Sequence, residues 1–205
     1  MPLTTSLDII NAACALIGED ALQSFDGEAG QAAHSIYEAA VNFNLGIYPF
    51  SFGKELHQLA RVTGATPLSG FTNVFDLPPD RLGPPIYVTD DATDPGRRFA
   101  RFALVGDVVH CDADPLFAMI KILPAPHRWS ATFRSCTITA CAAQLAFSLA
   151  SDRQTLETMN SLAYGSPIEN FRGGQMRAAI NEDAQATPPR RADWGNNPLT
   201  NSWRG

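Results

Sequence analysis

The chain has 205 residues, enough for one domain with an embellishment or for two small lobes. Hydrophobic residues make up 45% of it and charged residues 18%, a balance that allows a real core. The net charge of −6 argues against a protein that grips nucleic acid by neutralising phosphates, although an acidic wall would let DNA slide past. The sequence contains no run of about 18 apolar residues, so no membrane span is predicted. The first residues also lack the pattern of a signal peptide, so none is expected.

Two helices are predicted at the start of the chain. The segment Thr5–Asp8 can cap a first helix, and Gly18 ends it. A second helix should begin within Asp26–Glu28 and end before Pro49. The apolar stripe expected on the second helix comprises Ala33, Ile36, Ala40, Phe43 and Ile47.

From about residue 51 to residue 127 the chain becomes rich in prolines and in short extended pieces. Val105–Val108 predicts a tight hairpin turn, and the polar segment Asp90–Arg98 predicts a mobile loop. The candidate strands are Lys54–Leu59, Asn73–Leu77, Ile86–Val88, Phe99–Leu104, Val108–Cys111 and Ala118–Leu123.

Helices return in the last third of the chain. The helix expected over Ser130–Ala150 is apolar nearly all round, so it should be the central and most buried one. Another helix is expected over Asp152–Tyr164. The cap, proline and glutamate of Ser166–Glu169 predict a last helix to about Ala184, weakened in its middle by Gly173-Gly174. The apolar faces of the central helix comprise Ile138, Cys141, Leu145 and Leu149, and Phe133, Ala140 and Phe147.

These elements predict an α+β fold that is mainly α. Residues 1–50 and 128–186 should form one discontinuous bundle of about four to five helices. Residues 51–127 should form a β-rich insertion lobe, and residues 187–205 an extended C-terminal docking tail.

The last segment, Thr187–Gly205, holds three prolines, two glycines and three asparagines, so neither a helix nor a strand is predicted there. It also carries Trp194 and Trp203, two large apolar rings that a short tail cannot bury in itself. We expect these rings, with Pro198 and Leu199 between them, to dock into a partner surface that offsets the ordering entropy. The alternative is that both tryptophans fold back on their own domain.

The cysteines show no pairing pattern. Cys14, Cys111, Cys136 and Cys141 lack CxxC spacing and are expected to be reduced, buried, small hydrophobes in a cytoplasmic product. Cys136 and Cys141 lie roughly 140° apart around a helix, which disfavours a disulfide or a shared ligand site.

Catalytic and metal-binding patterns are weak. His110-Cys111-Asp112 and Asp114 are metal-capable, but neighbours in a strand point to opposite faces, so neither a metal site nor a cofactor is expected. His34, His57 and His127 lie on other elements, and no Gly-x-Ser-x-Gly elbow is present. We expect a protein that is not an enzyme. The alternative is a small cell-wall hydrolase with an unrecognised carboxylate pair.

Two further groups have a functional and a plainer interpretation. Arg97, Arg98 and Arg101 form a basic cluster that is either a solvated loop or a contact with an acidic, tail-facing neighbour. Tyr48, Phe50 and Phe52 could stack on bases, but their place between a helix and a strand favours a core position. These groups do not fix a function.

Several short motifs resemble the head-to-tail adaptor family of tailed phages and gene transfer agents, which includes tail tubular protein A. Leu7–Glu19 is similar to the first family helix and its "LG(E)" end. Tyr48-Pro49-Phe50-Ser51-Phe52 resembles "hPWNFA", with Phe50 in place of the usual tryptophan. Phe75-Asp76-Leu77-Pro78-Pro79-Asp80-Arg81-Leu82 resembles "F.LP.DCLR", and Gly106–Asp112 resembles a later hairpin. Gly165–Pro167 interrupts what is often one long final helix.

The resemblance implies a structural protein of the virion, located at the head–tail interface and assembled in the bacterial cytoplasm. Such proteins form a ring of about a dozen copies beneath the portal protein. The ring extends the channel through which DNA passes without specific binding, and it seats the next component, a stopper or a tail tube or nozzle protein. Trp194 and Trp203 would then be portal anchors. An alternative is another neck component, such as a stopper.

Overall fold

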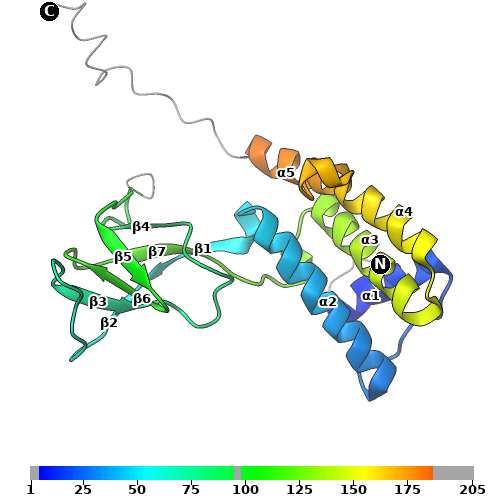
Figure 1. Cartoon of the computed structure of the whole chain (residues 1–205), viewed down its shortest axis with the longest axis horizontal. Helices are drawn as coiled ribbons and strands as arrows, with labels where there is room; N and C mark the ends of the chain where they lie inside the picture. The colour runs from blue at the N-terminus through cyan, green and yellow to red at the C-terminus, as the bar shows by residue number, and fades with distance from the viewer. Residues whose placement is uncertain (1–4, 95–97, 187–205) are drawn as a thin grey trace, which may run out of the picture.

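The computed structural model describes residues 5–94 and 98–186, and it has an α+β fold (Figure 1). Five α-helices gather at one end of the molecule, and two small antiparallel sheets form the other end. The helices are α1 (Ser6–Ile17), α2 (Gly27–Ile47), α3 (Ala131–Ala150), α4 (Arg153–Tyr164) and α5 (Gly174–Ala186). The strands are β1 (Lys54–Gln58), β2 (Ala60–Arg61), β3 (Asn73–Asp76), β4 (Tyr87–Thr89), β5 (Phe102–Val105), β6 (Val108–Cys111) and β7 (Phe117–Lys121).

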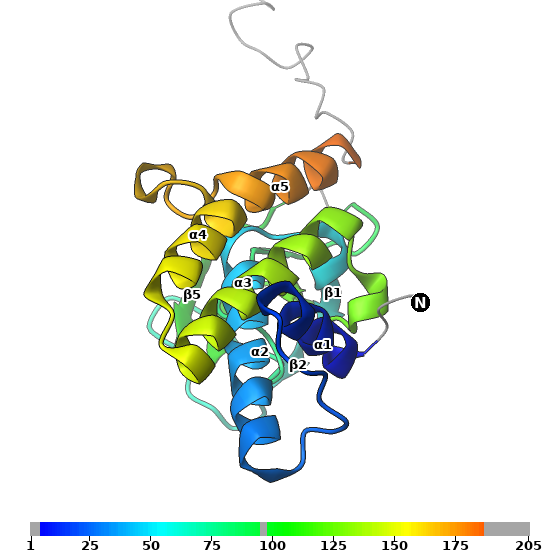
Figure 2. The same cartoon turned by 90° about the vertical axis from the view of Figure 1, so that its right-hand side faces the viewer.

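Helix α3 is the centre of the helical part, as the sequence predicted. It packs against α1, α2, α4 and α5, which surround it in Figure 2. Phe133, Cys136 and Cys141 on α3 are fully buried. Phe147 and Leu149, which were expected on its apolar faces, are instead 51% and 55% exposed, although Leu145 and Ala146 beside them are buried.

Three helices begin where the sequence predicted, and each begins with a side-chain cap. The Thr5 hydroxyl accepts the backbone N–H of Asp8, whose carboxylate accepts the Thr5 N–H in return, and Gly18 ends α1 with a φ of 78°. At α3 the Ser130 hydroxyl accepts the Phe133 N–H, and at α4 the Asp152 carboxylate accepts the Thr155 N–H; no reciprocal bond accompanies either cap.

The buried face of α2 differs from the predicted stripe. Tyr37, Val41 and Leu45 face the core, whereas Phe43 is 43% exposed. Asn44, which the predicted stripe did not include, is fully buried. Ala33 and Ala40 of the predicted stripe are buried as expected, so the core face overlaps the predicted one at these alanines and is centred further round the helix.

The β part consists of a three-stranded sheet, β1-β7-β4, and a four-stranded sheet, β2-β3-β6-β5. The predicted strands are present with ends shifted by up to three residues, and Val105 pairs with Val108 across the expected hairpin turn. The short strand β2 was not predicted. A second apolar cluster, separate from that of the helices, fills this part and includes Phe75, Val109 and Ile120.

The start of the last helix differs from the prediction. The capping box of Ser166 and Glu169 forms, but it supports only a 3₁₀ helix, Pro167–Glu169, and α5 begins at Gly174. Here the chain crosses itself closely: the Gly173 N–H donates to the Tyr164 carbonyl at 2.9 Å, and a Cβ at Gly173 would lie 2.8 Å from that oxygen. The glycine pair therefore permits a backbone crossing and lies at the start of the helix, not in its middle.

Polar contacts hold the end of α5 against the junction of the two parts. The Asp183 carboxylate, which is buried, accepts the Ser51 N–H at 2.8 Å and the Ser51 hydroxyl at 2.5 Å. Glu182 accepts a hydrogen bond from the Thr132 hydroxyl at the start of α3. The point from which the C-terminal segment departs is thus fixed beside the first residues after α2.

Candidate functional site

The predicted docking tail lies outside the described residues. Trp194, Pro198, Leu199 and Trp203 therefore have no position here, and the structure leaves their proposed role as a prediction. The last described residue before the tail is Ala186, at the end of α5.

The aromatic motif after α2 lies in the core of the helical part. The Phe50 ring is 1% exposed and its centroid lies 4.8 Å from that of Phe133. Tyr48 and Phe52 are half-buried and contact Phe50 from two sides, at 5.0 and 5.2 Å, and Pro49 lies between them in sequence. Because the Phe50 ring is buried, it offers no open face on which a base could stack.

The second motif extends from the β core to the helical core. Phe75 and Leu77 are buried among the strands, whereas Leu82 packs against the helical cluster and donates its N–H to Lys121 at 2.8 Å. Arg81 forms an ion pair with Asp107 at 2.6 Å. Residues from both motifs, which are about 25 residues apart in sequence, therefore pack against the same helical cluster.

The remaining motif residues differ in exposure. Pro78 is half-buried and accepts a hydrogen bond from the Arg81 guanidinium at 3.0 Å, which closes the turn after β3. Asp80 is exposed at the same turn. The motif thus combines buried anchors with one exposed carboxylate.

The arginines expected to cluster make different contacts. The Arg98 guanidinium lies 5.4 Å from the centroid of the Tyr87 ring, a cation–π distance. Arg101 pairs with Asp112 at 3.4 Å, and Arg97 lies outside the described residues. The two described arginines are therefore each engaged within their own chain.

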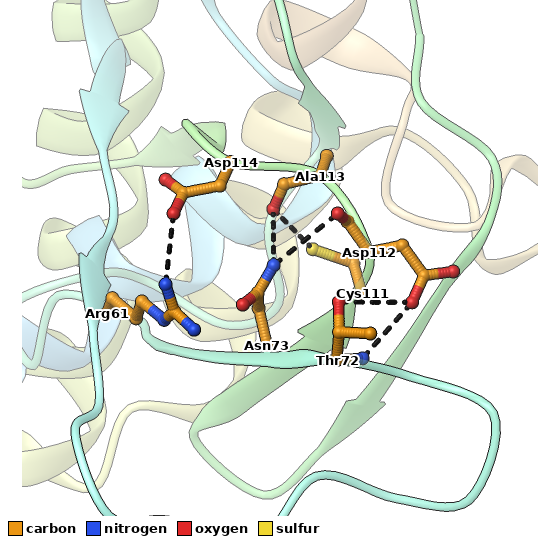
Figure 3. Close-up of polar contacts among 7 residues, drawn as sticks. All are labelled: Arg61, Thr72, Asn73, Cys111, Asp112, Ala113 and Asp114. Carbon is orange, nitrogen blue, oxygen red and sulfur yellow. Dashed lines mark hydrogen bonds and ion pairs between the residues drawn. The ribbon is translucent and has the colours of Figure 1, made fainter.

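The metal-capable residues Cys111, Asp112 and Asp114, at the end of β6 and just after it, make hydrogen bonds or ion pairs with neighbouring residues (Figure 3). Asp112 accepts the Thr72 N–H at 3.1 Å, and Asp114 pairs with Arg61 at 3.3 Å. The buried His110 ring accepts the Leu68 N–H through Nδ1 at 3.3 Å. Across residues 5–94 and 98–186, no three histidine, cysteine or acidic side chains lie close enough together to hold a metal ion.

The four cysteines are free and buried. Burial raises the pKa of the Cys136 thiol to about 12, and burial also raises the pKa of Cys141 to about 12. Both thiols stay protonated at neutral pH, so they behave as small apolar groups rather than as nucleophiles.

A buried polar network joins three helices. The Tyr164 hydroxyl of α4 donates to the Asn44 amide oxygen of α2 at 2.7 Å, and the Asn44 amide donates to the Thr137 hydroxyl of α3 at 3.1 Å. Thr137 donates in turn to the Phe133 carbonyl. The network fixes the positions of α2 and α4 on either side of α3.

An apolar groove of about 1110 Å³ lies over α3 between α2 and α4, and it is named the α2–α4 groove below. Ile36, Ala39 and Phe43 form its α2 wall. Leu156 and Tyr164 belong to its α4 wall. These side chains are mostly apolar, which is typical of a surface that another molecule or segment covers.

One end of the α2–α4 groove is closed by aromatic rings. Phe171 lies edge-on to Phe43, with centroids 5.3 Å apart, and edge-on to Tyr164 at 5.9 Å. Phe171 has a φ of 62°, a conformation that is rare for a bulky residue and costs about 1–3 kcal/mol. Its ring nevertheless remains 55% exposed. The strain therefore presents an aromatic face to solvent rather than to the core.

The sequence did not predict this groove. Phe43 was assigned to the core stripe, and Phe171 to the interior of a helix. One available signal was that Tyr37 and Val41 form a second apolar stripe on α2, which leaves Phe43 for another surface.

In comparisons with known proteins, no family model matches the chain and no curated protein matches it. The similarity to head-to-tail adaptors therefore rests on the short motifs and on the order of the elements. No described helix has both the length and the hydropathy that a membrane crossing requires.

Proposed function

We propose that this protein is a head-to-tail adaptor of a tailed phage or a phage-like particle. In this role, copies form a ring under the portal protein, extend the DNA channel and seat the next neck or tail component. The observation that supports this most is the convergence of two adaptor-like motifs. Tyr48 and Phe52 pack on the same apolar cluster as Leu82, at the junction between the helical and the β part.

The junction suits an adaptor because it ties two different surfaces together. Ile122 donates its N–H to Gly53 at 3.0 Å, and Lys121 donates to the Gly46 carbonyl at 3.4 Å, so strand β7 is bound to the end of α2. In the proposed ring, the helices pack on neighbouring subunits and the β part faces the downstream protein. A fixed junction would hold both surfaces in register.

The charge of the chain suits a channel component. Its net charge of −6 disfavours adhesion to phosphates, so DNA would pass the ring without specific binding. The proposal involves no cofactor, metal or catalytic step.

Binding to purified portal rings of the same particle tests the proposal. We expect the full-length chain to saturate the portal in a fixed ratio. In the Trp194→Ala/Trp203→Ala variant each lost anchor should weaken binding by about 2 kcal/mol, or about 30-fold. Unchanged binding by the variant would remove the anchoring role of the tail, and no binding by the wild type would reject the adaptor function.

The rival hydrolase is tested separately with the purified protein. Incubation with isolated bacterial cell walls should release neither reducing sugars nor peptides. Robust release by this protein would replace the adaptor proposal with an enzymatic one.

A further inference from the structure

We propose that the C-terminal segment Thr187–Gly205 of each chain occupies the α2–α4 groove of the same chain before the protein meets a partner. This inference does not depend on the proposed function, since it concerns the isolated subunit. It assigns an occupant to a groove whose apolar floor and aromatic end are otherwise exposed to water.

The chemistry of the segment matches the groove. Trp194 and Trp203 supply two large rings. The exposed faces and edges of Phe43 and Phe171 offer the partners with which indoles form stacked or edge-to-face contacts. Leu199 adds an aliphatic side chain between the two indoles.

Charge also favours this pairing. Three arginines and one aspartate give the segment a formal charge of +2, so the other 186 residues carry −8 of the total of −6. Among the described residues that line the groove, the one carboxylate is Glu157, and no arginine or lysine is present. Glu157 pairs with Arg153 at 2.8 Å, but both side chains are largely exposed, so this pair leaves the rim accessible.

The lengths are compatible. Helix α5 begins at Gly174, directly beside Gly165, which lines the groove. The two residues are so close that a Cβ added at Gly174 would lie 2.9 Å from the Gly165 nitrogen. Its 13 residues place Ala186 about 20 Å from that end. The eight residues from Ala186 to Trp194 span up to about 26 Å when extended. Trp194 can therefore reach the aromatic end of the groove.

The second indole can follow along the groove. Trp203 follows Trp194 by nine positions, which span up to about 30 Å, whereas the 12 residues of α4 extend over about 18 Å. A tether of this length gives an effective concentration in the millimolar range. At micromolar protein concentration, the segment therefore meets its own groove before that of another copy.

Quenching of tryptophan fluorescence by acrylamide tests this inference on the full-length chain. The Trp194→Phe/Trp203→Phe variant retains only Trp129, which is 4% exposed, and subtracting its signal isolates the two tail indoles. We expect the tail indoles of the wild type to be quenched several-fold less than those of a free peptide with the sequence of residues 187–205.

Two groove variants and one matched control locate the protection. Ala39→Lys places bulk and positive charge in the groove, and Ala29→Lys makes the same change at an exposed α2 position that does not line it. Phe171→Asn removes the exposed ring and suits the positive φ. Both groove variants should be quenched like the peptide, and the control like the wild type. Each substitution is also made in the Trp194→Phe/Trp203→Phe background, where an unaltered Trp129 signal reports that the variant is folded.

Three outcomes would overturn the inference. The tail indoles of the wild type could be quenched as readily as the peptide, which leaves the groove without this occupant. Protection that survives in both groove variants, or is lost equally in Ala29→Lys, would place the indoles elsewhere. Protection that disappears on dilution would assign the groove to the segment of a second copy.

Discussion

The helical part and the β part differ in where their exposed apolar side chains lie. In the helical part, exposed apolar side chains such as Phe43 and Phe171 line one continuous groove. In the β part, Leu104 and Val105 are exposed at a hairpin, and ion pairs such as that of Arg101 with Asp112 tie neighbouring segments together. The comparison indicates that the helical part has an apolar groove suited to a further segment or partner, whereas the exposed apolar side chains named in the β part lie at the tip of a hairpin.

The largest effect is expected from the helical core itself. Phe133→Ala should lower the free energy of unfolding by about 3–5 kcal/mol, because it opens a cavity between the aromatic rings of Phe50 and Trp129. Phe147→Ala on the same helix should cost less than about 1 kcal/mol, because this ring is 51% exposed. Urea denaturation followed by far-UV circular dichroism measures both. Equal losses would show that the boundary between core and surface on α3 is misplaced.

Alkaline pH should weaken the same core. Desolvation by burial raises the pKa of Tyr37 to about 12, like those of the thiols of Cys136 and Cys141. The unfolded chain releases these protons at lower pH, beginning near pH 9 for the thiols. The stability is thus complete below pH 9 and falls as the pH rises toward 12, by up to about 1.4 kcal/mol per pH unit for each group.

Denaturation curves between pH 8 and 11 measure this slope. Cys141→Ala should reduce it, since the substituted side chain has no proton to release. A slope that Cys141→Ala leaves unchanged would contradict the assignment of the alkaline loss to this buried thiol.

A smaller effect is expected from the buried polar network. Tyr164→Phe removes the hydroxyl that donates to Asn44 and leaves a buried amide oxygen without that partner, which costs about 1–3 kcal/mol. Tyr48→Phe, at a half-buried ring, serves as the matched control and should change stability by less than about 0.5 kcal/mol. Thermal denaturation distinguishes the two, and identical midpoints would mean that the network contributes no net stability.

The smallest effect is expected on the surface of the β part. Arg61→Ala breaks the pair with Asp114, in which both side chains are about half exposed, and should cost no more than about 1 kcal/mol. The loss should shrink further at high salt. A larger and salt-independent loss would indicate that Arg61 supports the turn through packing.

The sequence predicted the elements well where local chemistry decides them. Capping residues such as Thr5, Ser130 and Asp152 act over three or four residues, so the starts of α1, α3 and α4 could be located from short segments. The turn at Gly106, across which Val105 pairs with Val108, is local in the same sense.

Non-local packing set the limits of prediction. The capping box at Ser166 predicts a long helix. Only a short 3₁₀ helix forms there, because the chain then turns back and Gly173 hydrogen-bonds to Tyr164. Asn44 is buried because Thr137 and Tyr164, about 90 and 120 residues away, satisfy its amide. The α2–α4 groove follows from both features, so periodicity within one helix could not reveal it.

Electron cryo-microscopy of the full-length protein mixed with portal rings of its own particle tests the adaptor proposal most directly. The account predicts a closed ring of this chain at the base of the portal, with the helical parts of neighbouring subunits in contact and an open central channel. Particles in which the portal base stays bare at saturating protein concentration would contradict it.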